Sequence, residues 1–175
     1  VGAARTMHNA YYKLGYDIVI AGSPDFSFTD RKGFDNFVDN AIEHLDNKYM
    51  ISGIPLDDAG DFRFGFVIYT KKALENVGYI DPNFIPMGLS DGDYHRRCLI
   101  SWSPDRDLLY YGSPDNFINP PYGAIIRIPS IHTSYSKSSL GVDFTSTFIK
   151  ETADLFNMRY YAQKWGGLPG NEAGI

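Results

Sequence analysis

The sequence has one cysteine, fewer basic than acidic residues and no long apolar run, and each shortage excludes a class of protein. Cys98 has no second cysteine with which to form an internal disulfide, which fits a reducing, cytoplasmic compartment. Sixteen lysines and arginines against 21 acidic residues give a formal charge of −5, without the basic stripe of nucleic-acid-binding proteins. No apolar run is long enough to span a bilayer. We therefore expect a cytoplasmic or membrane-peripheral protein with no transmembrane segment and no nucleic-acid partner.

Strong catalytic motifs are also absent. The sequence has no Walker-type glycine loop, no CxxC pair, no HExxH and no GxSxG. These absences remove P-loop nucleotide hydrolysis, paired-cysteine chemistry, zinc-protease chemistry and the serine-hydrolase elbow from consideration. Candidate functional residues must therefore be identified from their positions at the ends of the predicted strands and helices.

What is present is enough material for one well-buried domain. The 175 residues are 43% hydrophobic and 15% aromatic, and no repeat or composition shift marks an internal boundary. Apolar residues at three- and four-residue spacing predict helices over 3–14, 34–45, 71–76, 91–102 and about 145–165. Apolar and β-branched runs predict strands over 17–22, 48–52, 62–69, 108–111 and 123–131.

The order of these elements predicts an α/β fold with added antiparallel strands. The run at 17–22 is nearly continuously apolar, which is typical of a strand that is buried on both faces of a parallel sheet. A helix directly before such a strand is half of a crossover unit, whose other strand would precede residue 1.

Asp25 follows the predicted strand 17–22. In open α/β sheets, ligands bind outside the carboxyl ends of the strands, where an aspartate can hold a hard cation such as Mg²⁺ or Mn²⁺. The alternative is an ordinary turn over 23–25, capped by its own side chains, and the local sequence favours that turn.

Asp91 and Asp93 begin the predicted helix 91–102, and Arg97 follows one turn later. Carboxylates favour a helix N-terminus because they accept from free amides and complement the dipole, so a helix cap with a salt bridge is one interpretation. The other is that one aspartate is a general base for an acceptor hydroxyl.

Two further features have a structural and a functional interpretation. His132, at the end of the predicted strand 123–131, is either a core or turn residue or a further metal ligand. The aromatic end of the last predicted helix, with Lys164 and Trp165, is either core packing or a surface for stacking on a sugar or base.

The order and spacing of these features resemble those of family 2 glycosyltransferases, which have the GT-A fold. Residues 2–25, GAARTMHNAYYKLGYDIVIAGSPD, are similar to the family segment that leads from an alanine-rich helix into the metal-binding strand end. Residues 77–97, VGYIDPNFIPMGLSDGDYHRR, resemble the family's "vG-fDe-f … ED-D … R" block. Residues 161–167, YAQKWGG, are similar to a tail of bacterial and phage-type members.

The resemblance implies a GT-A-like domain over 1–175, with a mixed, mainly parallel sheet flanked by helices and with its N-terminal nucleotide-binding strands missing. Asp25 matches the last aspartate of the D-x-D motif, which coordinates the Mn²⁺ or Mg²⁺ that holds the diphosphate. His132 lies where some members place a histidine near that metal. Asp91 matches the aspartate of the "ED" pair, the general base of inverting transfer from a nucleotide-diphosphate sugar to an acceptor hydroxyl.

The resemblance also implies substrate-binding positions. At two other positions, this sequence departs from the family motifs. The positions expected to contact substrate are Arg5, Asn9, Asp93, Arg97, Lys164 and Trp165. Ser23 stands at the first position of D-x-D, and Ser90 replaces the glutamate of "ED".

Two alternatives of other classes stay open. One is a non-catalytic relative that binds carbohydrate or assists assembly on the same scaffold, because fold does not fix function. The other is a sugar-phosphate nucleotidyltransferase, which shares the use of a metal at a strand end.

Overall fold

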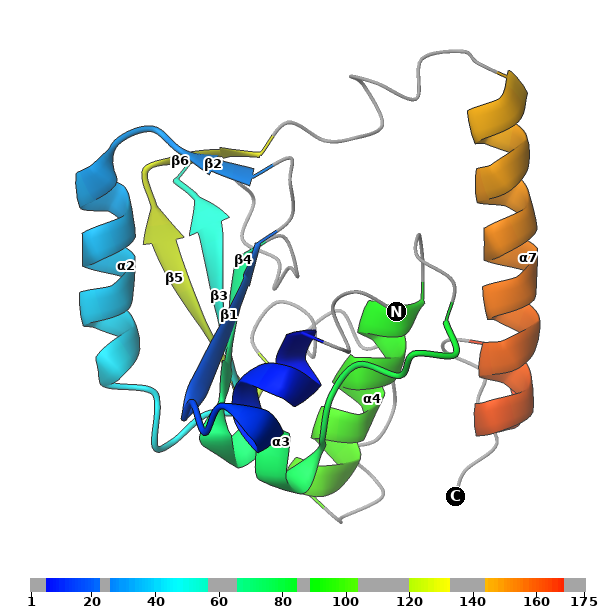
Figure 1. Cartoon of the computed structure of the whole chain (residues 1–175), viewed down its shortest axis with the longest axis horizontal. Coiled ribbons are helices and arrows are strands. Elements are labelled where there is room, and N and C mark those ends of the chain that lie inside the picture. The colour runs from blue at the N-terminus through cyan, green and yellow to red at the C-terminus, as the bar shows by residue number, and fades with distance from the viewer. Residues whose placement is uncertain are drawn as a thin grey trace.

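The structure is a computed structural model that describes residues 6–22, 26–56, 66–84, 89–103, 120–132 and 144–168 (Figure 1). Arg5, Asp25, Ser23 and the predicted strand 108–111 lie outside these residues.

A four-stranded mixed sheet forms the centre of the fold. Its order is β1 (Ile18–Gly22), β4 (Phe66–Thr70), β3 (Met50–Pro55) and β5 (Gly123–Ile128). β4 runs antiparallel to both β1 and β3, whereas β3 and β5 are parallel. The prediction of an α/β fold with a mixed sheet is confirmed. Its mainly parallel character is wrong for the described strands, because β4 lies between two strands of the opposite direction.

The prediction that 17–22 is buried on both faces is also wrong. β1 is an edge strand of the described sheet, and only Val19 in it is fully buried, while the side chain of Ile20 is 38% exposed. β3 and β4 are the strands buried along their whole length, since they have a neighbour on each side and a packed layer on each face.

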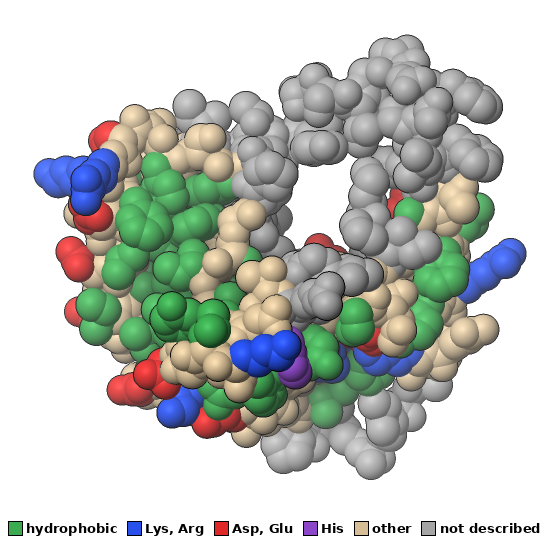
Figure 2. Space-filling model, in the orientation of Figure 1, with side chains coloured by type: hydrophobic (Ala, Val, Ile, Leu, Met, Phe, Trp, Pro, Cys, Tyr) green, Lys and Arg blue, Asp and Glu red, His purple; other side chains and the backbone are tan. Residues whose placement is uncertain are grey.

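Alternate residues of the central strands face two separate apolar clusters, as the two-residue period of a strand requires. On one face, Ile51 and Ile68 pack with Phe37 and Ala41 of α2 (Arg31–Ile42). On the other, Met50 and Val67 belong to a cluster that includes residues of α3 (Lys71–Asn76) and α4 (Ser90–Trp102). Hydrophobic side chains also gather at the surface between α2 and β1 (Figure 2).

The remaining helices lie on the α4 side. The chain is helical from residue 6, passes into a π-helical turn, η1 (Asn9–Lys13), and leaves it at Gly15, whose φ of +73° suits glycine. The last helix, α7 (Phe144–Trp165), lies beyond α4, on the opposite side of the molecule from α2 (Figure 1).

Several predicted elements are confirmed within a few residues. α3 has the predicted bounds, and α4 and α7 each begin one residue earlier than expected. The predicted strand 123–131 is divided at Pro129 into β5 and β6 (Ser130–His132), because proline has no amide proton to continue a ladder. β6 pairs with β2 (Phe26–Phe28), a short strand that the sequence did not indicate.

Candidate functional site

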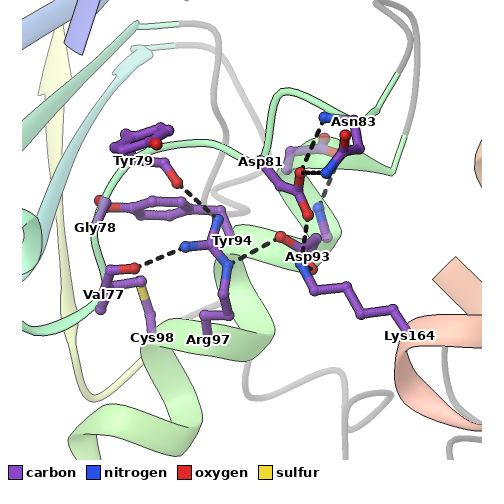
Figure 3. A network of polar contacts seen from close by, with 12 residues as sticks. Val77, Gly78, Tyr79, Asp81, Asn83, Asp93, Tyr94, Arg97, Cys98 and Lys164 are labelled. Atoms are coloured by element: carbon purple, nitrogen blue, oxygen red, sulfur yellow. Dashed lines mark hydrogen bonds and ion pairs between the residues drawn. The ribbon is translucent and has the colours of Figure 1, made fainter. Parts of the chain in front are cut away.

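A polar cluster among the described residues joins three segments that are distant in the sequence (Figure 3). They are the loop 77–84, the first turn of α4 and the last turn of α7. At its centre lies Asp93, whose side chain has no exposed surface. A carboxylate can be buried in this way only when charged or polar partners replace its water. We call these residues the Asp93 network; its members are Val77, Tyr79, Asp81, Asn83, Asp93, Arg97, Tyr160, Lys164 and Trp165.

Asp93 has three donors. Arg97 Nε donates to Oδ2 at 2.9 Å, one helical turn along α4. Lys164 Nζ lies 2.7 Å from Oδ1, and Trp165 Nε1 donates to the same oxygen at 3.0 Å. Hydrogen bonds to an ionised acceptor are about twice as strong as neutral ones, so these contacts fix the carboxylate firmly. Two of the three donors belong to α7.

Asp81 is the second carboxylate of the network. Its Oδ2 accepts from Lys164 Nζ at 2.7 Å and from the Tyr160 hydroxyl at 2.9 Å, and its Oδ1 accepts from the Asn83 backbone amide at 2.9 Å. Burial acts to raise the pKa of Asp81, but the hydrogen bonds from Lys164, Asn83 and Tyr160 outweigh it and hold the pKa below 3.8. Lys164 Nζ therefore bridges the carboxylates of Asp81 and Asp93.

Arg97 ties the loop to α4. Nη1 donates to the Val77 carbonyl at 2.8 Å and Nη2 to the Tyr79 carbonyl at 3.0 Å, while the guanidinium lies 4.8 Å from the centre of the Tyr94 ring. The planar guanidinium thus serves a carboxylate, two carbonyls and an aromatic face at once.

The chain enters α4 through an unusual backbone conformation. Leu89 has φ +60° and ψ −9°, a left-handed conformation that costs a residue with a Cβ atom about 1 kcal/mol or more. The Leu89 carbonyl accepts from the Asp93 amide at 2.9 Å. Asp91, between these two residues, is exposed, and its Oδ1 accepts from the Gly92 amide at 2.9 Å.

The two aspartates of this turn thus have different roles. The cap-and-salt-bridge interpretation describes Asp93, which pairs with Arg97. It describes Asp91 only in part, because Asp91 caps a free amide with one oxygen while its side chain remains in contact with solvent.

The aromatic end of α7 is both packed and polar. Tyr161 is fully buried, as the core interpretation expects. Trp165 is half-buried, and the Arg96 guanidinium lies 4.9 Å from the centre of its ring. Lys164 and Trp165, predicted as substrate contacts, both bind Asp93.

One of the two predicted metal ligands, His132, lies in a described strand pair, whereas the other, Asp25, is placed only by its position in the sequence. β2 pairs with β6 in a register that sets Phe26 opposite His132, and Asp25 directly precedes Phe26 in the sequence. His132 is described here by its backbone, and Asp25 lies outside the described residues. Among the side chains that are described, no group of three or more His, Cys, Asp or Glu residues could hold a metal ion.

Among its described residues, the opening helix meets the network through His8, whose ring lies 5.4 Å from the ring of Tyr79. Arg5 lies outside the described residues. Asn9 is half-buried in η1, where its carbonyl accepts from the Leu14 amide at 3.0 Å, and among the described contacts it makes none with the Asp93 network.

Sequence reasoning missed Asp81, Asn83 and Tyr160. The order Asp-Pro-Asn over 81–83 is a turn signal, in which the Asp81 side chain accepts from the Asn83 amide, so the turn could have been predicted. Its link to Tyr160 could not, because nothing local couples residues so far apart in the chain.

His95 is a further buried titratable group of α4. Its side chain is 3% exposed, and Tyr122 Oη lies 3.4 Å from Nε2. Burial lowers the pKa of His95 to about 3, because the charged imidazolium is poorly solvated there. His95 is therefore neutral at physiological pH and is poorly suited to act as a proton donor.

Comparisons with known proteins found no relative of this chain. No protein-family model matches this chain, and no curated protein and no solved structure shows significant similarity to it. In the part of the chain that the structure describes, every helix is too short or too polar to cross a membrane.

Proposed function

We propose that this chain is a glycosyltransferase of the GT-A type, similar to inverting family 2, which moves a sugar from a nucleotide-diphosphate sugar to an acceptor hydroxyl. The observation that carries the proposal is the pairing of β2 with β6, which sets Phe26 opposite His132. The strand that directly follows Asp25 in the sequence therefore lies beside the strand that ends at His132, and the resemblance separately assigns Asp25 and His132 to metal binding.

The sheet supports this location. β1, β3 and β5 run in the same direction, since β4 is antiparallel to β1 and β3, and β3 is parallel to β5. Their carboxyl ends point to the edge where β2 and β6 lie (Figure 1). This is the side of an open α/β sheet on which ligands bind. In the sequence, Asp25 comes shortly after the end of β1, and His132 is the last residue of β6, the strand that follows β5.

Asp25 and His132 are the residues that would hold the metal. A carboxylate with an imidazole fits Mn²⁺ better than Mg²⁺, which prefers oxygen ligands alone. A divalent cation bound there would offset the negative charge of the diphosphate leaving group.

Of the two aspartates in the first turn of α4, Asp91 is the one suited to be the general base. Its exposed carboxylate can reach an acceptor hydroxyl and accept its proton. Asp93 cannot, because its two oxygens already accept from Arg97, Lys164 and Trp165 and are closed to solvent. A hydroxyl activated by Asp91 would displace the nucleoside diphosphate in one step, which inverts the anomeric carbon.

Calorimetric titration of UDP, GDP and dTDP, each with and without Mn²⁺, tests the proposal. The protein should be the full product of the reading frame that contains this sequence. We expect one nucleotide to bind only with Mn²⁺, and this binding to be lost in Asp25→Ala and in His132→Ala. Asp35→Ala, on the exposed face of α2, is the matched control and should bind normally.

Two results would contradict the proposal. Absence of nucleotide binding under all conditions would favour a non-catalytic carbohydrate-binding or assembly protein. Release of pyrophosphate from a nucleoside triphosphate and a sugar phosphate would identify a nucleotidyltransferase.

A further inference from the structure

We infer that the last turn of α7 belongs to the working site: Lys164 and Trp165 are positioning residues that hold Asp91 in place by anchoring Asp93. The inference rests on the proposed function, since it takes Asp91 as the general base. It changes the role that the resemblance implied for Lys164 and Trp165, from substrate contact to support.

The first argument is that Asp91 lies between two fixed points. On one side is Leu89, whose left-handed conformation persists only where surrounding contacts enforce it. On the other side is Asp93, whose amide donates to the Leu89 carbonyl at 2.9 Å and whose carboxylate has three donors. Asp91 itself makes one local contact, with the Gly92 amide. Its direction is therefore set by its two neighbours.

The second argument is that α4 does not supply this anchor alone. Within α4, Asp93 is bound by Arg97. The two donors to Oδ1 both come from α7, and Lys164 also binds Asp81 Oδ2 at 2.7 Å. Without α7, Oδ1 of a fully buried carboxylate would lose both described partners, and the first turn of α4 would have to move to admit water.

The third argument is that Lys164 and Trp165 have little capacity left for a ligand. Lys164 uses two of its three N–H groups on carboxylates, and the single N–H of Trp165 is used on Asp93. The two carboxylates of the network are matched by two cations, Arg97 and Lys164, so the network carries no net charge. Its own members therefore have no excess positive charge with which to grip a diphosphate, and the neighbouring cation Arg96 packs against the Trp165 ring.

Lys164→Met and Trp165→Phe test the inference in the full protein. Lys164→Met keeps the stem and removes the charge, and Trp165→Phe keeps an aromatic ring and removes the N–H. We expect kcat to fall about 100-fold in Lys164→Met, as for a small misplacement of a reacting group. We expect about a tenfold fall in Trp165→Phe, which loses one hydrogen bond. The donor dissociation constant should stay within about twofold in both.

A second readout does not depend on turnover. Amide hydrogen exchange over residues 89–94 should become faster in both variants, because the first turn of α4 loses its anchor. Gln163→Ala, exposed on the same turn of α7, is the matched control and should alter neither kcat nor exchange. Lys164→Arg retains a cation and should recover most of kcat.

The outcomes separate this inference from the proposed function. A parent protein that transfers no sugar refutes the proposed function. An active parent whose Lys164→Met variant keeps its kcat, or loses donor affinity with kcat unchanged, refutes the positioning role. If Lys164→Met fails to fold, the milder Trp165→Phe decides by the same two criteria.

Discussion

The central sheet and the junction of α4 with α7 are held together by opposite means. In the sheet, β3 and β4 bury apolar side chains on both faces, as with Ile51 and Ile68 against α2. At the junction, the fully buried carboxylate of Asp93 is paired with Arg97 and Lys164, whose side chains are 20% and 26% exposed. Apolar burial is non-directional and roughly proportional to area, whereas a buried ion network is favourable only when each charge keeps its partners.

The comparison indicates where the fold can tolerate change. A cavity in the sheet can shrink as neighbouring side chains relax, so its cost is graded. A missing partner at the junction leaves a charge with neither water nor counterion, so its cost is abrupt. Such a junction is either fully formed or broken. When it is formed, it can hold the Asp91 side chain in one orientation.

The largest effect should come from Asp93→Ala. It removes the acceptor of Arg97, Lys164 and Trp165, and we expect the free energy of unfolding to fall by about 3–5 kcal/mol. Urea denaturation measures this loss. Asp91→Ala, in the same turn but exposed, should change stability by less than about 1 kcal/mol. Equal effects of the two substitutions would show that the network does not hold the junction.

In the sheet, Ile68→Ala should cost about 2–5 kcal/mol through the lost burial and the cavity that remains. Because no charge is involved, the loss should be the same at 0.05 M and 0.5 M salt. Ile42→Ala is the control, since that side chain is 60% exposed, and it should cost under about 0.5 kcal/mol. If the stability lost in Ile68→Ala depended strongly on salt, apolar burial in the sheet could not be contrasted with ion pairing at the junction.

Gly53→Ala probes how tightly α2 packs on the sheet. A Cβ atom at Gly53 would lie 2.8 Å from Ile128 Cδ1 and 3.0 Å from the Phe37 ring, and both neighbours are fully buried. We expect overpacking to cost about 1–3 kcal/mol in thermal or urea unfolding. Gly33→Ala is a poor control, since its Cβ would also meet a backbone oxygen at 3.0 Å. Gly15→Ala, in open space, isolates the separate cost of a positive φ.

The last prediction concerns the change in stability with each pH unit, which we attribute to His95. Its pKa is about 3 when folded and 6.5 otherwise, so the unfolded chain binds the extra proton. Stability from this group is complete above pH 6.5 and falls by up to about 1.4 kcal/mol per pH unit toward pH 3. His95→Phe should flatten this slope between pH 6.5 and 5, in urea titrations at several pH values. An unchanged slope would show that other groups carry the pH dependence.

Local patterns predicted the elements that form the site more accurately than they predicted its contacts. The apolar spacing of α7 and the acidic start of α4 placed both helices within one residue. The burial of β1 was mispredicted because its apolar composition does not reveal that it lies at the edge of the described sheet.

The site itself depends on contacts that no local signal encodes. The pairing of Phe26 with His132, and the bonds of Asp93 to Lys164 and Trp165, join segments far apart in the chain. From the sequence, Asp93, Lys164 and Trp165 were each predicted to contact the substrate. The structure shows that they are partners of one another.

The most direct test of the central claim is the turnover of Asp91→Asn, an uncharged side chain of the same shape. Sugar transfer to the acceptor hydroxyl should be measured beside donor binding, at a fixed Mn²⁺ concentration. If Asp91 is the general base, kcat should fall by about 10²–10⁴-fold while the donor dissociation constant stays unchanged. A variant that keeps kcat within about twofold of the parent would contradict the account.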